Sequence, residues 1–194
     1  MCGIVGIIDP LNTIENKKEL ITTLNDTQNH RGPDDSGYYN DQYISLGFKR
    51  LSIIDIYKGN QPIKKKHTIT IFNGEIYNFL NLKEELISLG AEFYSDSDSE
   101  VVANAFLYWG IKCVEKFDGM FAICFYDIHS KEIYLVRDRM GIKPLHYTFF
   151  KKSLIFSSEL ITITKIPGFE KEMNFNAISS YLSFRYPVDD QNLF

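Results

Sequence analysis

The sequence has little of several features that mark particular classes of protein. Its 194 residues include only three cysteines, Cys2, Cys113 and Cys124, which is too few for a closed disulfide framework. No run approaches the roughly 18 apolar residues of a membrane span, and the N-terminus lacks the basic region of a secretory signal. We therefore expect a cytoplasmic protein with no membrane association.

An excess of positive charge is lacking too. The formal net charge is −4, so nothing indicates a surface for nucleic acid or for anionic lipid. The four histidines have no metal-ligand spacing, and no Gly-x-x-x-x-Gly-Lys-Ser/Thr loop for phosphates is present. We expect neither a metal nor nucleic acid among the ligands.

The residues that are plentiful predict a folded domain. Hydrophobic residues make up 44% of the chain and charged residues 24%, a composition that argues against disorder. A chain of this length is expected to form one domain, without internal repeats or a boundary.

The spacing of apolar residues predicts strands and helices. Strands are expected over residues 3–8, 44–48, 68–72, 120–126, 132–136, 145–150 and 154–157. Helices are expected over residues 15–29, 77–89, 98–109 and 176–184. This order of elements indicates sheets covered by helices, an α+β arrangement.

Position 2 holds a residue with specific chemistry. If Met1 is removed, Cys2 carries both a thiol and an α-amino group, whose ordinary pKa values are about 8.5 and about 7.7–8.0. The amine can then accept the thiol proton, as the histidine of a Cys–His pair does. Taken alone, however, composition favours a plainer interpretation, in which Cys2 is a small buried residue after the start codon.

A series of short blocks follows in a fixed order along the chain. The blocks are MCGIVGIID (1–9), HRGPDDSG (30–37), RLSIID (50–55), FNGEIYN (72–78), SDSE (97–100), DGMFAICFYD (118–127) and RDRMGIKPLHY (137–147). Together they resemble class II glutamine amidotransferases, specifically the glutaminase half of asparagine synthetases, over almost the whole chain. The resemblance implies an N-terminal-nucleophile hydrolase fold, a four-layer αββα sandwich of two antiparallel sheets flanked by helices.

The resemblance also implies a reaction. Cys2 would attack the side-chain carboxamide of glutamine and form a γ-glutamyl thioester, which water would hydrolyse after ammonia has left. Asn73 and Gly74 match the family's donors to the oxyanion, an amide side chain and a backbone N–H. Without the flanking match, Asn73-Gly74 would favour a hairpin turn that closes the strand over 68–72.

Further positions match the family's contacts to the α-groups of glutamine. Arg50 matches the residue that binds the α-carboxylate, assisted by backbone groups of Leu51 and Ile53, and Glu75 and Asp98 match the acidic groups that face the α-ammonium. Outside its block, Arg50 would be typical of a solvated cation at a strand end.

Asp98 has a structural interpretation as well. Ser97 to Glu100 has the Ser-x-x-Glu pattern of a capping box, which would place Asp98 in the first turn of a helix. The two interpretations are compatible, because a capped helix start holds a carboxylate rigidly.

For two sets of charged residues, the sequence allows either a structural or a functional role. Arg31, Asp34 and Asp35 are predicted either to shape a loop over the pocket or to serve the fold alone. For residues 137–139, Arg-Asp-Arg, a salt-bridged turn that leads into Gly141 is favoured over a catalytic cluster.

The same resemblance sets expectations for domains and partners. Residues 1–194 would form the glutaminase domain, and about 176–194 would begin the linker to an ATP-dependent synthetase domain that the sequence does not contain. L-glutamine and that synthetase domain or subunit are the expected partners. No cofactor is expected here, because ATP and Mg belong to the synthetase domain.

Alternatives remain at this point. The domain could serve a different ammonia acceptor, such as a sugar acid or a peptide. It could also be a non-catalytic interaction module in which Met1 is retained. The sequence leaves the acceptor and the oligomeric state open, a homodimer included.

Overall fold

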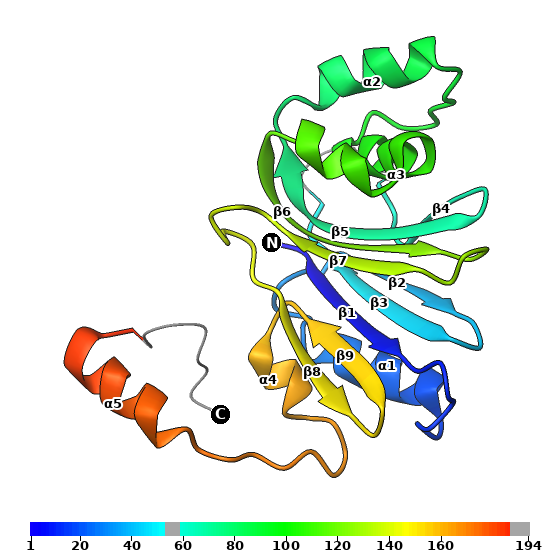
Figure 1. The fold of residues 1–194 in the computed structure, drawn as a ribbon. Coiled ribbons are helices and arrows are strands. Elements are labelled where there is room, and N and C mark those ends of the chain that lie inside the picture. Colours follow the sequence, from blue (N-terminus) through cyan, green and yellow to red (C-terminus); the bar gives the residue numbers. More distant parts are fainter. Residues whose placement is uncertain (53–58, 187–194) are drawn as a thin grey trace.

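A computed structural model describes residues 1–52 and 59–186 of the chain (Figure 1). Within them, two antiparallel sheets lie face to face. The first has the strand order β2 (Asp35–Asn40), β3 (Ile44–Arg50), β1 (Gly3–Ile8), β9 (Ser153–Ser157) and β8 (His146–Phe150). The second has the order β4 (Ile63–Lys65), β5 (Thr68–Ile76), β6 (Gly119–Asp127) and β7 (Ile133–Arg137).

Helices cover the outer face of each sheet, so that the body has four layers. In Figure 1, α2 (Phe79–Ser88) and α3 (Asp98–Trp109) lie above the second sheet, and α1 (Lys17–Asp26) and α4 (Leu160–Ile163) lie against the first. A 3₁₀ helix, η1 (Gly110–Lys116), follows α3 directly. The predicted αββα sandwich is confirmed.

Side chains from both sheets fill the layer between them. Ile4, Leu46, Ile71, Tyr126 and Phe156 are all buried in this shared cluster. Burial of aliphatic and aromatic side chains from both sheets holds the two sheets together.

The central strand β1 carries the N-terminus into this layer. It pairs antiparallel with β3 on one side and with β9 on the other. A Cβ at Gly6 would lie only 2.2 Å from the ring of Phe156, so glycine is required for that ring to pack on β1. Cys2 therefore comes directly before a strand that is paired with a neighbour on each side.

Two strands were not expected from the sequence. β2 has the sequence DSGYYN, which is rich in turn-forming residues, and β4 has only three residues. The four-residue helix α4 and η1 were also missed, because segments this short carry no clear periodicity.

The hairpin alternative for Asn73-Gly74 is wrong. β5 continues through both residues to Ile76, and β6 pairs with it along its whole length. Pairing with a strand distant in sequence overrides the local turn preference of Asn-Gly.

The last described element, α5 (Phe175–Phe184), lies to one side of the sandwich in Figure 1. The linker predicted from about residue 176 begins inside this helix and stays a prediction. No helix in residues 1–52 and 59–186 is both long and apolar enough to cross a membrane.

Candidate active site

A single pocket brings together segments that are far apart in the sequence. Cys2 comes from the start of β1, Arg50 and Leu51 from the end of β3, Asn73, Gly74 and Glu75 from β5, and Asp98 from the start of α3. All of these were predicted site residues. Ile53, the remaining predicted residue, lies outside the described residues.

The Cys2 thiol contacts the backbone of Leu51. The Leu51 N–H donates to Cys2 Sγ at 3.4 Å, and Sγ lies 3.7 Å from the Leu51 carbonyl oxygen. Burial raises the pKa of the thiol, while the Leu51 N–H and the positive charges of the N-terminus, Arg50 and Lys143 oppose that rise. The thiol therefore needs a base. Met1 also lines the pocket, and while it is present the nitrogen of Cys2 is part of a peptide bond and not a free amine.

Arg31 holds the nucleophile residue by its backbone. Arg31 Nε donates to the Cys2 carbonyl oxygen at 3.0 Å, and Nη1 pairs with Glu159 at 3.1 Å. Glu159 also accepts from His30 at 2.9 Å. This part of the HRGPDDSG block thus anchors the N-terminal strand.

The two aspartates of the same block support β3. Asp34 accepts from the Ser52 N–H at 2.7 Å, and Asp35 is the register partner of Arg50. Both therefore lie beside the segment that carries Arg50 and Leu51 into the pocket. Of the two roles left open for them, these contacts support the structural one.

Asn73 presents an unused donor. Its side chain is 1% exposed, and within the described part of the chain Nδ2 has no hydrogen-bond partner. A buried donor without a partner costs about 1–3 kcal/mol, and an oxygen of a ligand in the pocket would supply that partner. At Gly74, a Cβ would lie 2.3 Å from the Met120 carbonyl oxygen on β6, so only glycine fits next to Asn73.

A buried glutamine that the sequence did not suggest fixes the strand before Asn73. Gln61 Nε2 donates to the Phe72 carbonyl oxygen at 3.0 Å, and the Phe72 N–H donates to Gln61 Oε1 at 2.6 Å. The side-chain amide of Gln61 thus makes the two hydrogen bonds to Phe72 that the backbone of a neighbouring strand would make.

Asp98 begins α3 and faces the pocket. It is 7% exposed, and Oδ2 accepts from the Ile76 N–H at 3.1 Å. Burial raises the pKa of Asp98 to about 6, and the charge of Glu75 acts in the same direction while the Ile76 N–H opposes it. A cation at this position would favour the ionised form.

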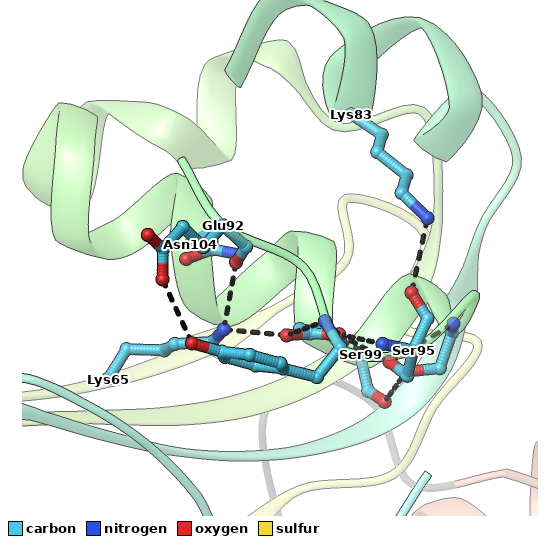
Figure 2. A network of polar contacts seen from close by, with 9 residues as sticks. Lys65, Lys83, Glu92, Ser95, Ser99 and Asn104 are labelled. Carbon is cyan, nitrogen blue, oxygen red and sulfur yellow. Dashed lines mark hydrogen bonds and ion pairs between the residues drawn. The ribbon is translucent and has the colours of Figure 1, made fainter. Parts of the chain in front are cut away.

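The capping box at the start of α3 is only half formed. Ser97 Oγ accepts from the Glu100 N–H at 3.3 Å, as predicted, but the Glu100 carboxylate does not return to the Ser97 N–H. It accepts from the N–H groups of Tyr94 and Ser95 and pairs with Lys65 at 2.6 Å. Figure 2 shows this network, which ties the loop before α3 to β4.

The residues 137–139 do not form the expected salt-bridged turn. In the described part of the chain, no ion pair involves Arg137, Asp138 or Arg139. Instead, Asp138 accepts from backbone N–H groups, and Arg137 donates to backbone carbonyls of the same loop. A tight loop leaves many backbone N–H and C=O groups without hydrogen-bond partners, and these two side chains supply such partners. The loop brings Lys143 into the pocket, which no local pattern in the sequence indicated.

In the residues that the structure describes, no group of three or more His, Cys, Asp or Glu side chains could hold a metal ion. Cys113 and Cys124 are buried free thiols outside the pocket.

Comparison with known sequences gives a consistent result. A family model described as a glutamine amidotransferase domain matches residues 1–194. Asparagine synthetase [glutamine-hydrolyzing] 1 of Bacillus subtilis is 37% identical over 197 residues, which cover 100% of this chain and 31% of that protein. Asparagine synthetase [glutamine-hydrolyzing] of Zea mays is 36% identical over 82% of this chain and 28% of its own length. The chain thus spans about a third or less of these relatives.

Solved structures show the same fold at low sequence identity. A glutamine phosphoribosylpyrophosphate amidotransferase from B. subtilis superposes with a TM-score of 0.72 and 19% identity, covering 84% of this chain and 43% of that chain. A second structure, described as the allosteric regulatory enzyme of purine biosynthesis, gives a TM-score of 0.71 at 18% identity, again over 84% of this chain and 43% of that one.

Proposed function

The chain belongs to the glutamine amidotransferase domain family, and from that premise we propose that it hydrolyses L-glutamine to L-glutamate and ammonia. The observation that carries the proposal is the unpartnered Nδ2 of Asn73 in the same pocket as the Cys2 thiol. A nucleophile and a waiting donor in one pocket are what acyl transfer requires.

The proposed reaction starts once Met1 is removed. The Cys2 α-amine takes the thiol proton, and the sulfur attacks the side-chain carbonyl carbon of glutamine. The oxyanion accepts hydrogen bonds from Asn73 Nδ2 and the Gly74 N–H. The ammonium then returns the proton to the leaving nitrogen, ammonia departs, and water hydrolyses the γ-glutamyl thioester with the same amine as base.

The other end of the pocket binds the α-groups of the substrate. The Arg50 guanidinium, held by Asn60 at 3.0 Å, binds the α-carboxylate, assisted by the backbone of Leu51 and of Ile53. Asp98 and Glu75 bind the α-ammonium. Asparagine is one methylene shorter, and a misplacement near 1 Å can cost about 10²-fold in rate, so it is rejected.

The proposal extends to a larger reaction. The relatives named above are called glutamine-hydrolyzing asparagine synthetases and are about three times as long as this chain. We propose that the ammonia passes to an ATP-dependent synthetase domain or subunit, with asparagine as the product. ATP and Mg would bind there, whereas the glutaminase chemistry uses only side chains and backbone of this domain. The proposed setting is the cytoplasm, where free thiols stay reduced.

Intact-mass measurement with 6-diazo-5-oxo-L-norleucine, a glutamine-like electrophile, tests the proposal together with an assay of ammonia release. We expect loss of the Met1 mass, one adduct on Cys2, and ammonia release that the adduct blocks. A processed chain that neither forms the adduct nor releases ammonia would refute the proposal. Retention of Met1 with no adduct would favour the interaction-module alternative.

A further inference from the structure

The loop between β7 and β8 is rigid at the point where it enters the pocket. The Asp138 carboxylate accepts from the N–H groups of Phe121 at 3.2 Å, Ile142 at 2.9 Å and Lys143 at 3.0 Å. Arg137 Nε donates to the Lys143 carbonyl oxygen at 2.8 Å. The N–H and the carbonyl oxygen of Lys143 are thus both held by hydrogen bonds.

This loop supplies a buried cation to the pocket. Lys143 is 7% exposed and lines the pocket together with Cys2 and Asn73. Among the described residues, no carboxylate forms an ion pair with it. Taking an ammonium out of water without a partner is costly, so such a group is typical of a functional site.

The other charged side chains of the pocket have the constant charges of the substrate to bind. Arg50 has the α-carboxylate of glutamine to bind, and Glu75 and Asp98 have its α-ammonium. Glutamine carries no second anionic group. Two anions arise in the pocket during the proposed reaction. The oxyanion has Asn73 and Gly74 as donors, and the other is the sulfur of Cys2, whose thiol already feels the positive charge of Lys143.

We propose that Lys143 is a further catalytic residue, whose ammonium stabilises the Cys2 thiolate. The thiol proton still moves to the α-amine. The hydrogen bonds from Arg137 and to Asp138 then hold this cation in the pocket of the nucleophile. The effect on turnover rests on the proposed glutaminase function, whereas the effect on the thiol does not.

The test compares Lys143→Met and Lys143→Arg with the unchanged chain, all with Met1 removed. The rate of Cys2 alkylation by iodoacetamide is followed against pH by peptide mass, because only the thiolate reacts. We expect Lys143→Met to slow alkylation at neutral pH by about tenfold and to move the profile to higher pH. Lys143→Arg should restore both, and kcat for glutamine should follow the alkylation rate. Lys64→Met, which removes an exposed lysine, is the matched control.

An unchanged alkylation profile in Lys143→Met would overturn the inference. Failure of Lys143→Arg to restore the rate in a folded protein would also overturn it, because shape rather than charge would then matter. If Lys143→Met does not fold, Lys143→Gln is measured in the same way. If alkylation depends on Lys143 but the protein never releases ammonia from glutamine, the proposed function fails and this inference stands.

Discussion

The two ends of the pocket are built in opposite ways. At the reacting end, Asn73 Nδ2 has no partner among the described residues, and Lys143 has no ion pair there. At the recognition end, Asp98 accepts from the Ile76 N–H, and Arg50 donates to Asn60. In the proposed reaction, the groups left open meet a charge only as the reaction proceeds, whereas the groups tied down meet a constant charge of the substrate.

This contrast has a kinetic consequence. Interactions made only in the transition state affect kcat, whereas interactions made equally with bound substrate affect KM. Substitutions at the reacting end should therefore lower kcat, and substitutions at the recognition end should raise KM.

The largest effect is expected for Cys2→Ala. Without the sulfur no thioester forms, so ammonia release should fall to background. The fold should be kept, because the substitution removes a single sulfur from a half-buried side chain that lines the pocket at the margin of the core. Ammonia release and the thermal midpoint are the measurements. Cys113→Ala is the control, since Cys113 lies in the core and should affect stability but not kcat. Glutaminase activity in Cys2→Ala would refute the mechanism.

Asn73→Ala is expected to be next in size. Loss of one oxyanion donor typically lowers kcat by about 10²–10³-fold, with little change in KM. The matched control is Asn104→Ala, because Asn104 is equally buried but donates to the Glu92 carbonyl oxygen at 3.2 Å, away from the pocket. Steady-state kinetics on both variants decide the matter. A rise in KM without a fall in kcat would place Asn73 at the recognition end.

The pH dependence of glutamine binding is expected to report Asp98. Its pKa is raised to about 6 by burial, so protonation below that pH removes the charge that faces the α-ammonium. Affinity should weaken about tenfold for each pH unit below about 6. The sign for stability is the reverse, because acid removes the cost of a buried carboxylate.

Binding is measured by calorimetric titration in the Cys2→Ala background, so that no turnover occurs. Asp98→Asn in the same background should bind glutamine more weakly at neutral pH and lose the acid limb. If glutamine affinity still falls at acid pH in Asp98→Asn, the titration belongs to another group.

The sequence predicted those parts of the molecule that depend on local signals. Residues 98–109 were predicted as a helix, and α3 has the same bounds, since Ser97 caps it and Gly110 ends it at a φ of 59°. Asn73-Gly74 showed the limit of local signals, because pairing with β6 decides its conformation. Family blocks, rather than spacing, singled out the pocket residues.

Long-range contacts were out of reach of the sequence. Arg31 and Glu159 are 128 residues apart, and no periodicity links them. Lys143 enters the pocket only because side chain–backbone hydrogen bonds shape its loop, and that loop looked like a simple charged turn. A buried lysine with no ion pair among residues 1–52 and 59–186 becomes visible only in three dimensions.

The smallest effect is expected for Lys65→Met, which acts on Asp98 from a distance. Lys65 pairs with Glu100, and the Glu100 carboxylate accepts from the Ser95 N–H in the loop before Asp98. Lys65 and Ser95 are labelled in Figure 2. Without this pair, Asp98 should be positioned less precisely, and KM for glutamine should rise about fivefold, equivalent to about 1 kcal/mol, at unchanged kcat. Lys65→Arg should restore KM. Lys116→Met, which breaks the more exposed pair with Glu85, should leave KM unchanged. A fall in kcat instead would show that the two ends of the pocket are coupled through α3.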